Sequence, residues 1–216
     1  MASYYYLVAS LPTLFLDEES PLTPAEFMAA CDQWLDADDA RDIHGLMDNH
    51  STCAKASSIT QASTVAEPGA AEARAMADKS LDTTADKPEG IKGACANQWL
   101  ARETEIRNAL VRLRAAKVRV DAEPFLRPCR ELDLYTEKAV AEAMSRPQPL
   151  ERELGLDQLR WSLLDDLSRF DPFGLPAVIA YALKLKLVER WSALTVEKGR
   201  AVVEEYLTKQ LTEIAI

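Results

Sequence analysis

Histidine and glycine are scarce in this chain of 216 residues, which contains 2 His and 7 Gly. So little glycine argues against an all-β fold, because such folds need many tight turns. The sequence also has no Walker A motif and no GxGxxG motif, so it offers no standard backbone cradle for nucleotide phosphates. No hydrophobic run approaches the roughly 20 residues that a membrane-spanning helix needs.

Cysteine is also sparse, and its four copies are scattered without a CxxC pair. This spacing fits reduced thiols in the cytosol better than a disulfide framework. A zinc site could in principle be assembled from two cysteines and both histidines, namely Cys31, His44, His50 and Cys53. Their spacing matches no standard zinc finger, so we expect no metal centre, and the sequence predicts no cofactor.

Positive charge is in the minority, with 25 basic against 35 acidic residues and a formal net charge of −10. This balance argues against binding nucleic acid through general phosphate attraction. The acidic run of Asp36, Asp38, Asp39 and Asp42 lacks the spacing of a calcium loop and is expected at a solvated helix boundary. Adjacent carboxylates, at 165–166 and 204–205, point about 100° apart on a helix and would not converge on one substrate. With no GxSxG motif either, the sequence predicts a protein that is not an enzyme.

The sequence does contain apolar residues that recur at helical spacing. Thr23, followed by Pro24 and Glu26, forms a capping box that predicts a helix start. The side chains expected to be buried along this and the later helices are Phe27, Ala30, Cys31, Trp34, Trp99, Ile106, Leu110, Leu113, Leu132, Tyr135, Ala139, Val140, Leu156, Leu159, Leu163, Leu167, Val196, Val203, Leu207, Leu211 and Ile214.

Composition divides the chain into three parts. Residues 1–48 and 94–216 carry the helical patterns, whereas residues 49–93 are rich in Ala, Ser and Thr and contain no aromatic residue. With so little apolar surface, 49–93 is expected to be a flexible, disordered insertion. Residues 4–11 are too few to decide between a strand and a helix, although three consecutive tyrosines favour a strand. The sequence therefore predicts an all-α antiparallel helical bundle with one disordered insertion.

Two expected helices, at 105–117 and 178–191, carry clustered positive charge inside an acidic protein. Arginine suits fixed, bidentate pairing with carboxylates, which occurs both within a chain and at subunit contacts. Both interpretations remain open at this point. The candidate partner-contact residues on the two helices are Arg107, Asn108, Arg112, Arg114, Tyr181, Lys184, Glu189 and Arg190.

Three short segments resemble proteins of V-type ATPases. Residues 4–12, YYYLVASLP, are similar to a family of short bacterial proteins encoded among V-type ATPase genes, at the place where a C subunit is expected. Residues 107–115, RNALVRLRA, and 180–190, AYALKLKLVER, resemble helices of the C subunit (called d in eukaryotes) of V-type and A-type rotary ATPases.

The resemblance implies an all-α, non-catalytic subunit between the central rotor shaft and the membrane ring of a motor that couples ATP turnover to ion transport. Its partners would be other ATPase subunits, without nucleic acid and without direct membrane insertion. Its location would be cytoplasmic, peripheral to the membrane through the complex. A full C subunit has three helical bundles and is longer than this chain. Two alternatives stay open: an assembly factor or regulator of the same complex, and a helical enzyme with an unrecognised site.

Overall fold

The computed structural model describes residues 4–48, 93–129 and 133–214, with side chains up to Thr208. All regular elements in these ranges are helices: α1 (Tyr4–Ser10), α2 (Pro24–Trp34), α3 (Ala37–Asp48), α6 (Ala94–Val118), the 3-10 turn η2 (Glu123–Phe125), α7 (Leu134–Ser145), α8 (Pro149–Ser168), α9 (Leu175–Ala193) and α10 (Val196–Ile214). The predicted all-α fold is confirmed. The tyrosine-rich start forms a helix rather than the strand that propensity favours. The expected flexible insertion lies, except for Gly93, outside the described residues.

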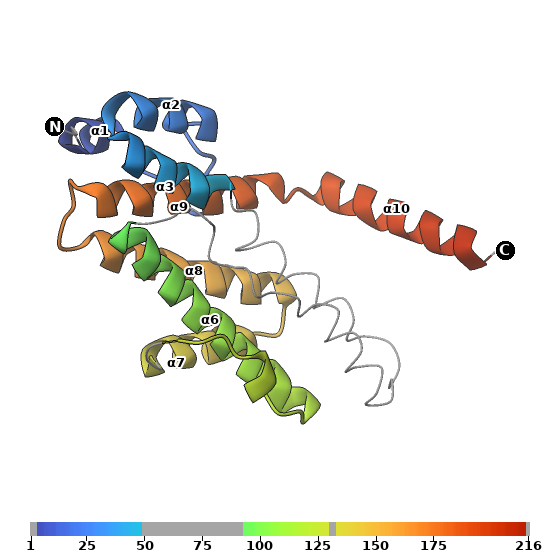
Figure 1. Ribbon diagram of the computed structural model, residues 1–216. Helices are drawn as coiled ribbons and strands as arrows, with labels where there is room; N and C mark the ends of the chain where they lie inside the picture. The colour runs from blue at the N-terminus through green and yellow to red at the C-terminus, as the bar shows by residue number, and fades with distance from the viewer. Residues whose placement is uncertain (1–3, 49–92, 130–132, 215–216) are drawn as a thin grey trace.

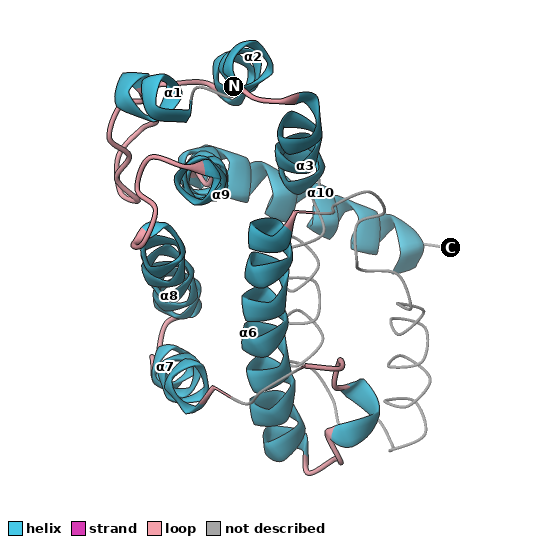
Figure 2. Cartoon of the chain, turned by 60° about the vertical axis from the view of Figure 1, so that its left-hand side comes forward, coloured by secondary structure: helices cyan, strands magenta, loops and turns pink. Residues whose placement is uncertain are grey.

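Helix α9 lies at the centre of the arrangement. Helices α1, α2 and α3 pack on one side of it, while α8 and α6 pack on the other, and α7 lies against α6 and α8 (Figures 1 and 2). A helix that is apolar on most of its circumference is expected in such a position. The buried residues of α9 are Val178, Ile179, Ala180, Ala182, Leu183, Leu185, Leu187 and Val188.

Local signals set most helix ends. At the start of α2, the Glu26 N–H donates to Thr23 Oγ1 (3.3 Å) and the Thr23 N–H donates to Glu26 Oε2 (2.9 Å), which is the predicted capping box. Helix α6 ends where Arg119 adopts a left-handed conformation (φ 59°), and the next N–H, that of Val120, returns to Ala115 O. The breaker at 146–149 separates α7 from α8, as the sequence predicts.

Most of the predicted core is confirmed, but two aromatic predictions are wrong. The predicted residues that are buried are Phe27, Cys31, Trp99, Ile106, Leu110, Val140, Leu156, Leu159 and Leu163, and those that pack partly buried against them are Ala30, Leu113, Ala139 and Leu167. Trp34 is 39% exposed at the last position of α2, beside Tyr6 of α1, and Tyr135 is 60% exposed in the first turn of α7. On α7 the buried face instead contains Thr136 and Val140. Leu132 lies outside the described residues.

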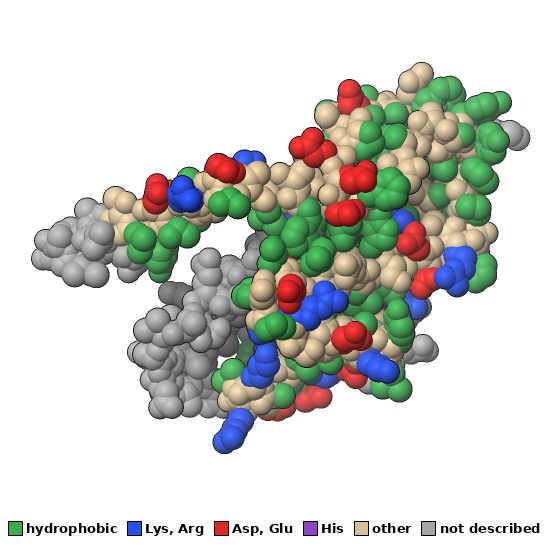
Figure 3. Space-filling view, turned by 180° about the vertical axis from the view of Figure 1, so that it is seen from behind, with side chains coloured by type: hydrophobic (Ala, Val, Ile, Leu, Met, Phe, Trp, Pro, Cys, Tyr) green, Lys and Arg blue, Asp and Glu red, His purple; other side chains and the backbone are tan. Residues whose placement is uncertain are grey.

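Helix α10 runs away from the bundle toward the C-terminus (Figure 1), and none of the substantial helix–helix packing in the described part of the chain includes it. The sequence predicts that its apolar stripe is buried, which is wrong for the side chains described. The exposed ones are Val196, Val202, Val203, Tyr206 and Leu207. Hydrophobic side chains are visible along this arm in Figure 3. No described helix is both long enough and apolar enough to cross a membrane.

Candidate functional site

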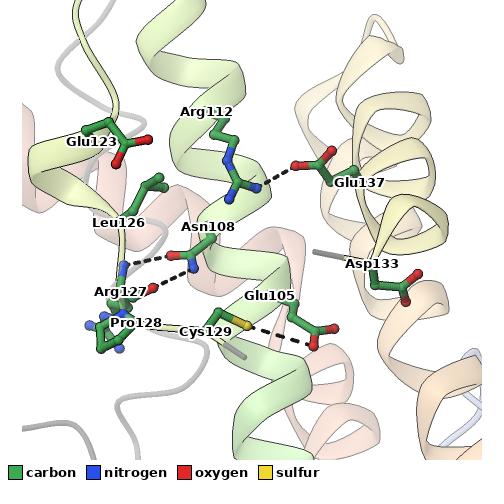
Figure 4. A pocket seen from close by; sticks show the side chains of 10 residues that line it. All are labelled: Glu105, Asn108, Arg112, Glu123, Leu126, Arg127, Pro128, Cys129, Asp133 and Glu137. Atoms are coloured by element: carbon green, nitrogen blue, oxygen red, sulfur yellow. Dashed lines mark hydrogen bonds and ion pairs between the residues drawn. The ribbon is translucent and has the colours of Figure 1, made fainter. Parts of the chain in front are cut away.

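A groove of about 500 Å³ opens between α6, α7 and the segment that joins them (Figure 4). Carboxylates outnumber arginines on its walls. The lining residues are Glu105, Asn108, Arg112, Glu123, Leu126, Arg127, Pro128, Cys129, Asp133 and Glu137. Two of the eight predicted contact residues, Asn108 and Arg112, therefore meet at one place.

Asn108 joins two parts of the groove wall, helix α6 and the segment that contains Arg127. Its side chain is buried on α6, its Nδ2 donates to the carbonyl of Arg127 (2.9 Å), and its Oδ1 accepts from the Arg127 N–H (3.0 Å) (Figure 4). This reciprocal pair satisfies both main-chain groups of a residue that lies outside regular structure. Asn108 therefore fixes the connecting segment onto α6.

Arg112 and Glu137 connect the two helices across the groove. Arg112 Nη1 lies 2.5 Å from Glu137 Oε1, and both side chains are about one third exposed. Elsewhere in the groove, the exposed Cys129 thiol lies 3.9 Å from Oε1 of Glu105 on α6, to which it donates a weak hydrogen bond (Figure 4).

A buried ion-pair network, which is not among the features predicted from the sequence, joins α6, α8 and α9. Arg160 contacts Glu103 through two nitrogens (3.1 and 3.2 Å) and Asp157 through a third (2.7 Å). Asp157 also accepts from Arg190 and from the Trp191 indole N–H, both at 2.9 Å. Arg160, Glu103 and Asp157 are at most 4% exposed. Each of these charges is therefore balanced by an opposite charge inside the protein, as burial requires.

A sequence signal for this network does exist. Glu103 lies four residues after Trp99 and three before Ile106, so it falls on the apolar stripe of α6. Arg160 lies four residues after Leu156 and three before Leu163, on the apolar stripe of α8. A charged residue inside an apolar stripe predicts a buried pair.

The other predicted contact residues lie apart from the groove, and most of them pair within the chain. Arg107 lies 3.5 Å from Glu103, Lys184 pairs with Asp165 (2.5 Å) and lies over the Trp161 ring, and Arg190 adds Glu153 (2.9 Å) to its contact with Asp157. Tyr181 packs its ring on Phe27, at 5.3 Å between centroids. The side chains of Arg114 and Glu189 make no ion pair or hydrogen bond with other described residues.

The Tyr181 hydroxyl is buried without a hydrogen-bond partner in the described part of the chain. Because burial disfavours the charged phenolate, the pKa of Tyr181 rises to about 12. This hydroxyl is therefore a neutral, desolvated group on α9, whose ring packs against Phe27 of α2.

Of the four candidate zinc ligands, the two in the described part of the chain, Cys31 and His44, belong to no cluster of potential metal ligands. Cys31 is buried, and burial together with the charge of Asp32 raises the pKa of its thiol to about 12, whereas His44 Nε2 lies 2.8 Å from Asp32 Oδ1. His50 and Cys53 lie outside the described residues. Across ranges 4–48, 93–129 and 133–214, no group of three or more potential metal ligands occurs.

The sequence predicts that the acidic run at 36–42 lies at a solvated helix boundary, but only part of the run is solvated. Asp42 is 6% exposed and accepts a hydrogen bond from the Gly93 N–H (2.6 Å), which ties α3 to the start of α6. Asp39 accepts from the Tyr4 hydroxyl, which ties α3 to α1. These two carboxylates therefore stabilise the fold, while Asp36 and Asp38 are exposed.

Residues 131–212 match the model of a family described as a protein of unknown function (DUF2764). The matched stretch contains α7, α8 and α9 and most of α10, so it includes one wall of the groove and the exposed arm. Comparison with curated proteins and with solved structures gives no match.

Proposed function

We propose that this protein is a non-catalytic coupling subunit of a bacterial V/A-type rotary ATPase, which links the central rotor shaft to the membrane ring. The observation that carries the proposal is α10, a 19-residue helix whose apolar side chains are exposed away from the bundle. An amphipathic helix of this kind is expected to bury its apolar face in another chain. The partner complex is inferred from the resemblance of residues 4–12, 107–115 and 180–190 to rotary-ATPase proteins.

Buried ion pairs between helices agree with a part that would have to bear torque. Arg160 on α8 pairs with Glu103 on α6, and Asp157 on α8 pairs with Arg190 on α9, so ion pairs join all three helices. Most of the remaining cations on α6 and α9 are also held in intramolecular pairs. These contacts support a rigid body with one arm free to dock.

An assembly factor or regulator of the same complex is the second candidate. The two roles differ in stoichiometry: a subunit is present once per rotor, whereas an assembly factor leaves the finished motor.

The test is purification of the intact ATPase from native membranes through a tag on another subunit. The expected result is one copy of this protein per complex. A Val203→Glu/Leu207→Glu variant should be lost from the complex, because both side chains lie on one exposed face of α10. Glu205→Gln, about 200° around the helix from Val203, is the matched control and should copurify like the wild type.

Each outcome separates the candidates. Substoichiometric recovery that peaks during assembly would establish the second candidate instead. An ATPase that purifies without this protein at every stage would overturn both. The arm variant should melt at the wild-type temperature, since its substituted side chains contact no other helix substantially; a lower melting temperature would show that α10 belongs to the bundle.

A further inference from the structure

Four aromatic rings form a continuous exposed row across the N-terminal helices. Trp34 lies 6.2 Å from Tyr6, Tyr6 lies 5.8 Å from Tyr5, and Tyr5 lies 5.1 Å from Phe173, measured between ring centroids. All four are between 39% and 65% exposed. Single exposed aromatics are common, but rings from α1, α2 and the turn before α9 in mutual contact form a patch, and such patches mark interaction sites. We call these four residues the aromatic row.

Three of the four residues in the aromatic row lie within residues 1–48, which is the acidic part of the chain. Residues 1–48 contain ten acidic residues and one basic residue, so they carry a formal charge of −9 out of the total of −10. The exposed carboxylates of Asp32 and Asp36 flank Trp34 in sequence, and Asp171 precedes Phe173 by two positions. In the face drawn in Figure 3, acidic and hydrophobic side chains gather together over the N-terminal helices.

The negative field reaches α1 itself. The pKa of Tyr4 is raised by burial, by its hydrogen bond to Asp39, and by the charges of Asp39 and Asp36. Tyr4 immediately precedes the two row tyrosines. A ligand that lies on the row therefore meets aromatic faces and negative charge together.

We propose that the aromatic row is the docking site for a basic, amphipathic segment of another protein. Arginine or lysine side chains of that segment lie over the rings and pair with the neighbouring carboxylates, and its apolar side chains pack between the rings. Opposite charge also raises the association rate. The proposal stands independently of which complex α10 joins.

Charge complementarity disfavours the other occupants. A second copy docked by the same face would bring two surfaces of like sign together, which costs free energy. Anionic lipid and nucleic acid would be repelled for the same reason. A basic protein segment is the occupant whose charge and apolar content both fit.

The test uses the full chain and a dye-labelled synthetic peptide of about 18 residues, with leucine and arginine at amphipathic helical spacing. Fluorescence anisotropy should show binding in the micromolar range, which weakens as salt rises from about 50 to about 300 mM. Tyr6→Ala/Trp34→Ala should weaken binding by at least about tenfold, since it removes two adjacent rings. Phe170→Ala, which removes an exposed aromatic outside the row, should leave the dissociation constant within about twofold.

Three results would overturn the proposal. The first is equal binding by the wild type and the row variant at matched melting temperatures, which would mean that charge alone holds the peptide. The second is no binding by the wild type. The third is self-association of the wild type in sedimentation that the row variant abolishes, which would identify a second copy as the occupant.

Discussion

Arg160 on α8 and Glu103 on α6 form a buried bidentate ion pair. Arg160 Nε lies 3.1 Å from Glu103 Oε2 and Nη2 lies 3.2 Å from Oε1, and the two residues are 4% and 3% exposed. The planar guanidinium matches the carboxylate fork, so the pair fixes both the spacing and the register of the two helices.

Arg160→Met should therefore destabilise the protein strongly. It leaves the carboxylate of Glu103 buried with its principal partner removed, and breaking such a pair from one side costs about 3–5 kcal/mol of unfolding free energy. Urea melts measure this. Arg41→Met is the control, because Arg41 and Asp38 are 61% and 90% exposed, and its effect should stay within about 0.5 kcal/mol. Equal effects of the two substitutions would contradict a buried pair in solution.

Asn108→Ala should loosen the segment between α6 and α7. The substitution removes two hydrogen bonds to the partly buried main chain of Arg127, and each is worth about 0.5–1.5 kcal/mol. Hydrogen exchange of the Arg127 amide should accelerate. Asn108→Asp keeps the acceptor Oδ1, so it should retain more of that protection than alanine does. Identical exchange in the wild type and Asn108→Ala would show that the pairing does not form.

The helix boundaries are the part of the fold that local sequence predicts well. The capping box at Thr23, the prolines that follow Arg146 and the turn before Leu175 each act within a few residues of the chain. Such signals need no tertiary information, because they satisfy or remove main-chain hydrogen bonds directly.

The residues that pack against each helix are harder to predict from the sequence. Periodicity identifies the apolar face of α10, but it cannot say whether the same chain covers that face, and here it leaves Val203 and Leu207 exposed. Likewise Arg107 and Arg112 are recognisable as clustered cations, yet their carboxylate partners are set by helix packing rather than by spacing. The groove depends on a turn between α6 and α7 whose path no motif encodes.

Tyr181→Phe should stabilise the protein. The hydroxyl loses its hydrogen bonds to water on burial and gains no described partner, so its removal should raise the unfolding free energy by about 1 kcal/mol. The ring and its contact with Phe27 are retained. Tyr135→Phe, at an exposed tyrosine, should change nothing measurable. A loss of stability specific to Tyr181→Phe would reveal a hydrogen bond to the hydroxyl.

Glu26 should make stability depend on pH in the acid range. The hydrogen bonds that its carboxylate accepts from the Thr23 N–H and hydroxyl lower the pKa of Glu26 from 4.5. A carboxyl whose pKa is lower in the folded state stabilises the fold above 4.5, and this contribution is lost as pH falls through the lowered pKa. Urea melts should show a constant difference between the wild type and Glu26→Gln from pH 7 to about 5, which disappears in acid. In a Thr23→Val background the difference should shrink; a difference independent of pH would contradict the capping box.

The free thiols should react in the order of their burial. Cys129 is exposed, whereas Cys31 is fully buried, and burial with the Asp32 charge raises the pKa of the Cys31 thiol to about 12. At pH 8 the Cys31 thiol therefore stays in its unreactive, protonated form, and reagent reaches it only when α2 opens. Peptide mapping after treatment with N-ethylmaleimide should therefore find Cys129 modified first and Cys31 modified at the rate of opening. That rate should rise in Arg160→Met, which weakens the bundle, and both thiols should react alike in denaturant. Modification of Cys31 as fast as Cys129 in the native wild type would show that α2 does not cover it.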